Sequence, residues 1–212
     1  AMTGKIVTIA QQKGGAGKST LAAHLALAWA LKKKSVALVD IDPQQSLAAW
    51  YGQREISLGA DQTRITFASA TGWRAAGVVE KLAKTHDYVL IDSPPHADTD
   101  ARVAVRAADL VLVPVQPSPL DVWATLPTLE MAVKEKSAVL LVLNRVPPRA
   151  NLTAQMITKL GGYKVTVAKS TIGNRVAFAD AMVSGRTALE TKASSVAAKE
   201  LRALANELAK AL

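Results

Sequence analysis

A glycine-rich run near the start of the chain has the residue types and the spacing that bind the phosphates of a nucleotide. The run reads Lys13-Gly14-Gly15-Ala16-Gly17-Lys18-Ser19-Thr20. Its glycines allow the main chain to curl, so that successive N–H groups can point at phosphate oxygens. Lys18 can place its charge on the β- and γ-phosphates, and the Ser19 hydroxyl can ligate Mg²⁺. We therefore predict a nucleoside-triphosphate site at this loop.

One position departs from the usual eight-residue pattern, which begins with glycine where this chain has Gln12. The alternative interpretation is a glycine-rich turn that holds no ligand. However, the apolar segment Lys5–Ala10 precedes the run, and an apolar helical face begins at Leu21. This strand–loop–helix context is what a phosphate loop requires. Nucleotide binding is therefore the favoured interpretation.

Two further apolar segments end in acidic residues. Asp92 is the last residue of the segment Tyr88–Asp92. Asp40 is the last residue of the segment Val36–Asp40, and Asp42 lies two residues after it. A lone Asp after a strand is more often a cap or turn residue. Since parallel strands present their carboxyl ends at one edge of a sheet, all three acids should lie beside the phosphate loop. An acid there can hold Mg²⁺ or its waters, so we predict a magnesium-dependent site.

The elements that must position these residues alternate between strand and helix patterns. The predicted strands are Lys5–Ala10, Val36–Asp40, Ile65–Ser69, Tyr88–Asp92, Leu110–Val115, Ala138–Leu143 and Lys164–Ala168. The predicted helices are 18–33, 72–85, 99–107, 119–135, 151–160, 174–184 and 194–211. Alternation of this kind is typical of an α/β fold with a doubly wound, mostly parallel sheet between two helical layers. We expect one domain over residues 1–212.

Charge and composition restrict the partners. Residues 131–212 hold 13 Lys and Arg but only 5 Asp and Glu, a net charge of +8 out of +9 for the whole chain. Such a region favours a polyanion, either nucleic acid or an anionic membrane surface, although a merely solvated basic surface is the plainer alternative. Cysteine is absent, which rules out disulfides and thiolate metal sites and is compatible with the cytoplasm. The longest apolar stretch, Leu21–Leu31, is too short to span a bilayer, and no export signal is expected.

These motifs together resemble the ParA/MinD group of P-loop ATPases, and within it the small ParA-type (ParF-like) partition ATPases. The glycine-rich run resembles the group's deviant Walker A loop, with Lys13 as its signature lysine, and Gln12 is normal there. The other matching segments are Asp40-Ile41-Asp42-Pro43-Gln44, Asp92-Ser93-Pro94-Pro95, Leu143-Asn144-Arg145 and the stretch from Arg175 to Glu190. The resemblance covers nearly the whole chain and implies a P-loop fold that uses ATP and Mg²⁺.

For nucleotide binding, the resemblance implies a role for each residue of the loop. Lys18 would serve the phosphates of its own subunit, and Thr20 would meet the α-phosphate. Asn144 matches the position that reads the adenine edge. The main chain that cradles the phosphates would be that of Gly14, Gly15, Ala16 and Gly17.

For hydrolysis, the resemblance implies that ATP closes two subunits face to face into a homodimer. Lys13 would then reach the phosphates of the partner, which makes hydrolysis depend on dimerisation as an arginine finger would. Asp42 would orient the attacking water with Asp40 in support, and Asp92 would organise Mg²⁺ together with Ser19.

The group's activity, carried over to this chain, would be an ATP-dependent switch that binds DNA without sequence preference. A ParB-like protein, a ribbon–helix–helix protein or another cargo adaptor would stimulate hydrolysis. A plasmid, chromosome region or other cargo would thereby be segregated or positioned along the nucleoid. The implied location is cytoplasmic and nucleoid-associated, without integral membrane association. Arg175 is the first candidate for a DNA contact, and weaker candidates are Lys169, Arg186, Lys192, Lys199 and Arg202.

Three alternatives use the same phosphate site. A MinD-like membrane switch would more often carry Trp or Phe in its closing helix, and residues 194–211 contain neither. A metabolic P-loop enzyme would need a substrate motif, which the sequence does not display. A nucleotide-gated binding module that barely hydrolyses ATP would differ from the leading hypothesis only in turnover.

Overall fold

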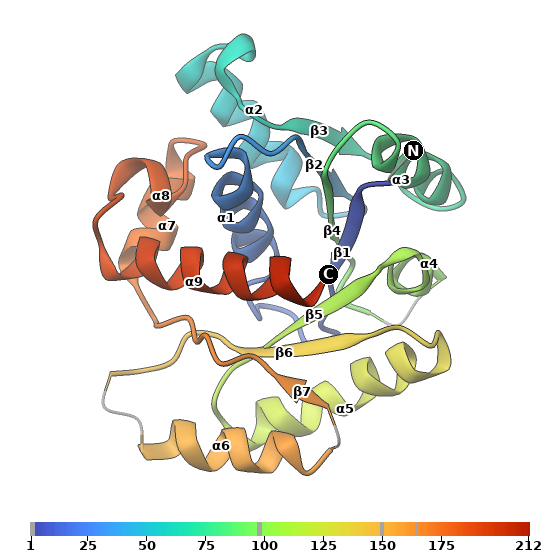
Figure 1. The fold of residues 1–212 in the computed structure, drawn as a ribbon, viewed down its shortest axis with the longest axis vertical. Coiled ribbons are helices and arrows are strands. Elements are labelled where there is room, and N and C mark those ends of the chain that lie inside the picture. The colour runs from blue at the N-terminus through green and yellow to red at the C-terminus, as the bar shows by residue number, and fades with distance from the viewer. Residues whose placement is uncertain (1–2, 97–98, 149–150, 164) are drawn as a thin grey trace.

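Seven parallel strands form one sheet in the computed structural model, which describes residues 3–96, 99–148, 151–163 and 165–212 (Figure 1). Their order across the sheet is β3-β2-β4-β1-β5-β6-β7, and each of these pairings is parallel. The strands are β1 (Lys5–Ile9), β2 (Val36–Asp40), β3 (Thr66–Ser69), β4 (Tyr88–Asp92), β5 (Leu110–Val115), β6 (Val139–Leu143) and β7 (Thr166–Val167). The predicted strands are therefore confirmed; Lys164, predicted to begin the last one, lies outside the described residues.

Helices cover both faces of the sheet (Figure 1). One face carries α1 (Lys18–Ala30), α2 (Ser46–Leu58), α7 (Val176–Val183), α8 (Ala188–Thr191) and α9 (Val196–Ala211). The opposite face carries α3 (Arg74–Ala83), α4 (Thr99–Ala107), α5 (Pro119–Lys134) and α6 (Asn151–Gly161). The predicted three-layer, doubly wound α/β fold is confirmed.

The position of β1 in the sheet locates the functional site. Strands β2 and β5 are buried along their whole length, as expected for continuous apolar runs covered on both faces. β1 lies between β4 and β5, so the chain moves outward in opposite directions on its two sides. Ligands bind at such a switch point, beyond the carboxyl ends of the strands. The glycine-rich run follows β1 and therefore lies there.

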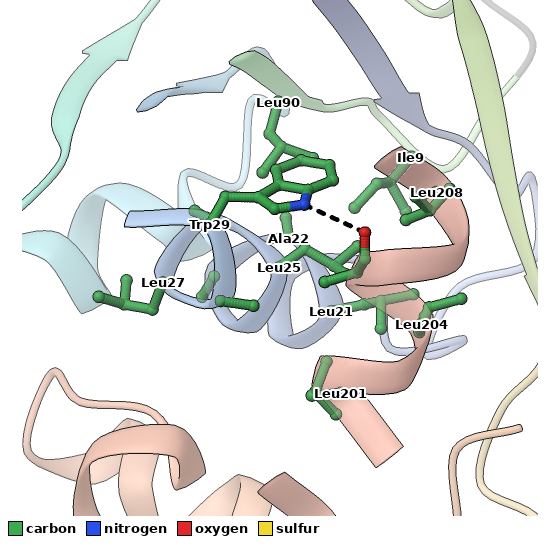
Figure 2. Packing of buried hydrophobic residues seen from close by; sticks show 14 of the residues in the cluster. Ile9, Leu21, Ala22, Leu25, Leu27, Trp29, Leu90, Leu201, Leu204 and Leu208 are labelled. Atoms are coloured by element: carbon green, nitrogen blue, oxygen red, sulfur yellow. Dashed lines mark hydrogen bonds between the residues drawn. The ribbon is translucent and has the colours of Figure 1, made fainter. Parts of the chain in front are cut away.

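Helices α1 and α9, the first and last of the chain, pack together on the face of the sheet that both cover (Figure 2). The indole Nε1 of Trp29 donates to the carbonyl oxygen of Ala205 over 3.1 Å, which joins α1 to α9. The buried face of α9 consists of leucines and small alanines, as its spacing predicts. Val196, the first residue of α9, is 54% exposed and does not belong to that face.

Helix α2 was not predicted by the periodicity, and this is the largest error in the predicted elements. Its buried positions are Leu47, Trp50 and Arg54, so a charged residue occupies one of three inward places and interrupts the apolar pattern. The guanidinium of Arg54 is fully buried and forms a two-pronged ion pair with Glu190 of α8. It also donates to the carbonyl oxygen of Gly185. The Arg54 guanidinium therefore links α2 to α8 and to the segment between α7 and α8.

Arg54→Met should lower the free energy of unfolding by about 3–5 kcal/mol, because it leaves the largely buried carboxylate of Glu190 without its partner. Urea denaturation followed by circular dichroism measures the change. The matched control is Arg102→Met, which removes an exposed guanidinium from its pair with Glu135 and should cost far less. Equal losses in the two variants would show that the buried pair does not fasten α2.

Candidate functional site

The phosphate loop runs from the end of β1 to Lys18, where α1 begins. Gly17 has a φ of 87°, and a Cβ there would lie 2.7 Å from the amide nitrogen of Asn144. A side chain at position 17 would therefore strain the backbone and push the Asn144 side chain away. Asn144 donates to the carbonyl oxygen of Ala16 over 2.9 Å, and Arg145 donates to that of Gly15. Two consecutive residues after β6 thus hold the loop from outside.

The base of the loop is bonded to β5 and α5. The side-chain amide of Gln11 donates to Pro114 O over 3.1 Å and to Thr125 Oγ1 over 3.0 Å. The backbone N–H of Gln12 donates to Thr128 Oγ1. Gln12 is also absent from the residues with positive φ, so its position does not require the glycine of the usual pattern. These bonds explain how the loop keeps its shape with glutamine at position 12.

Lys18 occupies the first turn of α1 and is 7% exposed. Burial lowers the pKa of its ammonium group, and the nearby carboxylates of Asp92 and Asp42 oppose that shift. An ammonium group in such a place lacks much of its water and is stabilised by further negative charge. The triphosphate of a bound nucleotide would supply it. The loop and the start of α1 thus combine a cation with backbone N–H groups at a helix N-terminus.

A magnesium ion fits the pair formed by Ser19 and Asp92. The Ser19 hydroxyl donates to Asp92 Oδ2 over 2.5 Å. Among the described residues, Oδ1 of Asp92 is a buried side-chain oxygen that has no hydrogen-bond partner. Burial raises the pKa of Asp92 to about 7, the Ser19 hydrogen bond opposes the rise, and the carboxylate of Asp40 adds to it. A hydroxyl and a carboxylate oxygen are ligands that Mg²⁺ prefers, and the cation would satisfy the orphaned oxygen.

Asp92→Asn should stabilise the ligand-free protein at alkaline pH. The pKa of this carboxyl rises from 3.8 in the unfolded chain to about 7 in the folded protein. The folded protein therefore becomes less stable as pH increases, because the unfolded chain releases this proton at a lower pH. The free energy of unfolding therefore falls between about pH 4 and pH 7 and stays low at higher pH. At pH 8 the variant should exceed the wild type by on the order of 2–4 kcal/mol, and the difference should shrink toward pH 4.

Chemical denaturation without Mg²⁺ at both pH values measures this difference. If Asp92→Asn stabilised the protein equally at pH 4 and pH 8, the effect would not come from the raised pKa of Asp92.

The three acids predicted to meet at this edge do so. Asp40 and Asp92 are register partners on β2 and β4. The carboxylate of Asp40 accepts the backbone N–H groups of Asp42, Leu47 and Ala48 over 3.1–3.2 Å. Asp40 therefore holds the first turn of α2 and the loop that carries Asp42. Asp42 is only half-buried, so its carboxylate borders the space next to Lys18.

Lys13 forms an ion pair with Asp121 of its own chain, and this pairing was not predicted. Asp121 lies in the first turn of α5, where Ser118 caps the helix by accepting the Asp121 N–H over 3.1 Å. The signature lysine thus rests against its own subunit while its side chain stays 38% exposed. Ser118 followed by Pro119 is a recognisable helix start, which is the signal that could have located Asp121.

A pocket of about 610 Å³ continues from the phosphate loop toward α7. Thr20 and Asn144, predicted to contact a nucleotide, both line it. Arg175, predicted to contact DNA, also lines it and forms an ion pair with Glu200 of α9. No pattern in the sequence indicates that Arg175 lines the same pocket as Thr20, because the two residues are far apart along the chain.

The other basic residues predicted to bind DNA lie between the end of β7 and the middle of α9. Lys169, Lys192 and Lys199 are exposed, whereas Arg186 and Arg202 are half-buried. Figure 1 places α7, α8 and α9 on one face of the sheet. No helix among the described residues is both long and apolar enough to cross a membrane.

Comparison with known proteins relates the chain to nucleotide-binding proteins. The model of the "CobQ/CobB/MinD/ParA nucleotide binding domain" matches residues 7–188. The chain is 30% identical over 211 residues to the maintenance of carboxysome distribution protein A of Halothiobacillus neapolitanus, and the match covers 95% of each protein.

Two solved structures are similar in fold. The cell division ATPase MinD of Pyrococcus furiosus gives a TM-score of 0.80 at 23% identity, covering 99% of this chain and 100% of that one. An ATP complex of McdA from Cyanothece gives a TM-score of 0.81 at 18% identity, covering 99% and 98%. At these identities the similarity shows the fold.

Proposed function

The chain belongs to the CobQ/CobB/MinD/ParA nucleotide-binding family, and on that premise we propose that it is a ParA-type ATPase that positions a cargo. In this proposal ATP drives dimerisation and non-specific DNA binding, and a partner protein stimulates hydrolysis. The observation that carries the proposal is the site at the switch point of the sheet. There a buried Lys18, a second lysine at position 13 and the Ser19–Asp92 pair border one phosphate loop.

Hydrolysis requires positioning and charge stabilisation more than covalent chemistry. Lys18 and the backbone N–H groups of the loop would bind the β- and γ-phosphates. Ser19 and Asp92 would hold Mg²⁺, which neutralises charge on the phosphate oxygens when it is bound. Asp42 is the candidate to orient the attacking water, and Asp40 fixes its loop. Asn144 is the candidate that reads the base.

Dimerisation would place Lys13 against the phosphates of the partner subunit. Supporting this, two large apolar side chains of α5 close in sequence to Asp121 are exposed, Leu120 by 70% and Trp123 by 56%. Apolar side chains of this size beside a charged pair are typical of a protein–protein interface. A second subunit that covers them would bring its triphosphate close to Lys13.

DNA binding is supported by the charge of the C-terminal part of the chain. Residues 131–212 carry a net charge of +8, and Lys169, Lys192 and Lys199 are exposed there. Contacts of lysine and arginine with phosphates give affinity without sequence preference, and they weaken steeply as salt displaces them. Nucleoid association in the cytoplasm would follow from such binding.

Gel retardation of an arbitrary duplex tests this part of the proposal. We expect retardation with ATP but not with ADP, and loss of the complex as the salt concentration rises. Equal retardation with ATP, ADP and no nucleotide would refute the switch. Parallel sedimentation with anionic liposomes separates the alternative of a MinD-like membrane switch, which would bind vesicles instead of the duplex.

The cargo and the partner are proposed by analogy with a relative. The name of the Halothiobacillus protein assigns it to carboxysome distribution, so a protein assembly is one cargo to consider besides a plasmid or chromosome region. The partner would be a ParB-like protein, a ribbon–helix–helix protein or another adaptor. Turnover that stays negligible with DNA and every candidate partner would favour a nucleotide-gated binding module. Turnover of a small molecule would favour a metabolic enzyme.

A further inference from the structure

The side chain of Gln11, which follows β1, uses all of its hydrogen-bonding positions and is 3% exposed. Its amide nitrogen donates to Pro114 O and to Thr125 Oγ1. Its Oε1 accepts the backbone N–H of Lys13 over 3.4 Å and the hydroxyl of Thr128 over 3.2 Å. The orientation of the amide is fixed, because Pro114 O can only accept and the N–H of Lys13 can only donate. Gln11 therefore joins β5 and α5 to the first residue of the glycine-rich run.

Two threonines of α5, Thr125 and Thr128, complete this network and are fully buried. Thr125 Oγ1 accepts from Gln11, so its own proton goes to Asp121 O over 2.8 Å. Thr128 Oγ1 accepts the N–H of Gln12, so its proton goes to Gln11 Oε1. Each hydroxyl thus donates once and accepts once, which fixes the direction of every bond in the network.

Lys13 is held by this network at its backbone and at its charged group. Its N–H donates to Gln11, and its ammonium group pairs with Asp121. The carbonyl oxygen of Asp121 accepts the hydroxyl of Thr125, which in turn accepts from Gln11. These four residues form a closed ring, so the position of Lys13 is coupled to that of α5.

The middle of the phosphate loop is held by other residues. Asn144 and Arg145 donate to carbonyl oxygens there, and Lys18 belongs to α1. Neither of these two bonds involves Gln11. A change at position 11 should therefore displace Lys13 and leave Lys18 in place.

Helix α5 also carries apolar side chains that face the solvent. Leu120 is 70% exposed and Trp123 is 56% exposed. In the proposed dimer a second subunit covers them. The helix that holds Lys13 would then be the one on which the second subunit docks.

We propose that Gln11, through its bonds to Thr125 and Thr128, positions Lys13 for the phosphates of the second subunit. The inference rests on the proposed function, in which Lys13 acts on a partner subunit, and it adds the residue that places this lysine. Gln11 acts through Lys13 and is a positioning residue.

Gln11→Met tests the proposal, because methionine has a similar length but forms none of these bonds. Misplacing a reacting group by about 1 Å can cost about 10²-fold in rate. We therefore expect phosphate release with ATP, Mg²⁺ and duplex DNA to fall by about 10- to 100-fold. The ATP affinity measured by calorimetry should change by less than about threefold, because Lys18 keeps its place.

Two threonine variants accompany this measurement. Thr128→Val removes one hydroxyl of the network and should cause a smaller loss of rate, again without loss of ATP affinity. Thr8→Val is the matched control, because the buried Thr8 hydroxyl donates to Ala104 O over 2.6 Å, outside the network. It should keep both the rate and the affinity. Thermal melting checks that each variant is folded, and Thr128→Val replaces Gln11→Met in every measurement if the latter does not fold.

Mixing two variants shows on which subunit Gln11 acts. Asp42→Asn keeps Gln11 and Lys13 but lacks the carboxylate proposed to orient the attacking water. In a mixed dimer it would supply a well-placed Lys13 to the site of the Gln11→Met subunit. An equal mixture should therefore recover about a quarter of the wild-type rate, since half of the dimers are mixed and each has one complete site.

The outcomes separate the inference from the proposed function. Wild-type protein that releases no phosphate overturns the proposed function, and the inference with it. Wild-type hydrolysis with an unaltered rate in Gln11→Met overturns the inference alone. Equal loss of rate and of ATP affinity also overturns it, because Gln11 would then shape the site of its own subunit. A mixture whose rate is only the mean of the two separate variants overturns it for the same reason.

Discussion

Lys18→Ala should abolish nucleotide-dependent activity. The ammonium group of Lys18 is buried in the first turn of α1, where in the proposed function it meets the triphosphate of its own subunit. Removing one preorganised electrostatic group from such a site typically costs about 10²–10³ in rate, and this lysine would also contribute to ground-state binding. We therefore expect hydrolysis to fall at least about 100-fold and ATP-dependent DNA retardation to disappear.

The measurement is phosphate release with saturating DNA and Mg²⁺. Lys34→Ala removes an exposed lysine after α1 and should leave the rate unchanged. Hydrolysis by Lys18→Ala at the wild-type rate would show that the phosphates bind elsewhere.

Lys13→Ala should separate binding from hydrolysis. In the single chain Lys13 pairs with Asp121 and is partly exposed, so it adds little to the site of its own subunit. If it completes the site of the partner, its loss resembles the loss of an arginine finger supplied in trans, which is worth about 10³–10⁵ in rate. We expect stimulated hydrolysis to fall by about 10³-fold and ATP affinity of the monomer to change by less than about threefold.

Asp121→Asn distinguishes this role from a structural one. The substitution breaks the ion pair with Lys13 but keeps the lysine, so hydrolysis and ATP-induced dimerisation should persist. Light scattering reports the dimer, and phosphate release reports the rate. If Asp121→Asn reproduced the defect of Lys13→Ala, the lysine would act by holding α5 and not by reaching a second subunit.

The sequence predicted the sheet well because β2, β4, β5 and β6 are buried along all or nearly all of their length. Continuous apolar runs such as Leu110–Val115 can be read without tertiary information, and their polar ends identify the edge where Asp92 lies. The glycine spacing likewise located the loop before α1, since backbone conformation at Gly17 is a local property. These features depend on short stretches of chain.

The remaining features depend on contacts between distant segments. Helix α2 was missed because Arg54 is buried by Glu190, 136 residues away, which no periodicity can indicate. Asp121 lies 108 residues from Lys13, and its pairing needs the fold of α5. Arg175 was predicted to contact DNA from the resemblance, and that prediction stays untested; its place in the pocket and its pair with Glu200 follow from the packing of α9. Ion pairs between residues far apart in the sequence cannot be predicted from its periodicity.

Calorimetric titration of the purified protein with ATP tests the central claim most directly. The phosphate loop, Lys18 and the Ser19–Asp92 pair require Mg²⁺-dependent uptake of about one ATP per chain. Chelation of Mg²⁺ should weaken that uptake. No heat of binding with Mg²⁺ and ATP present, from protein shown to be folded, would contradict the assignment of this loop as a triphosphate site.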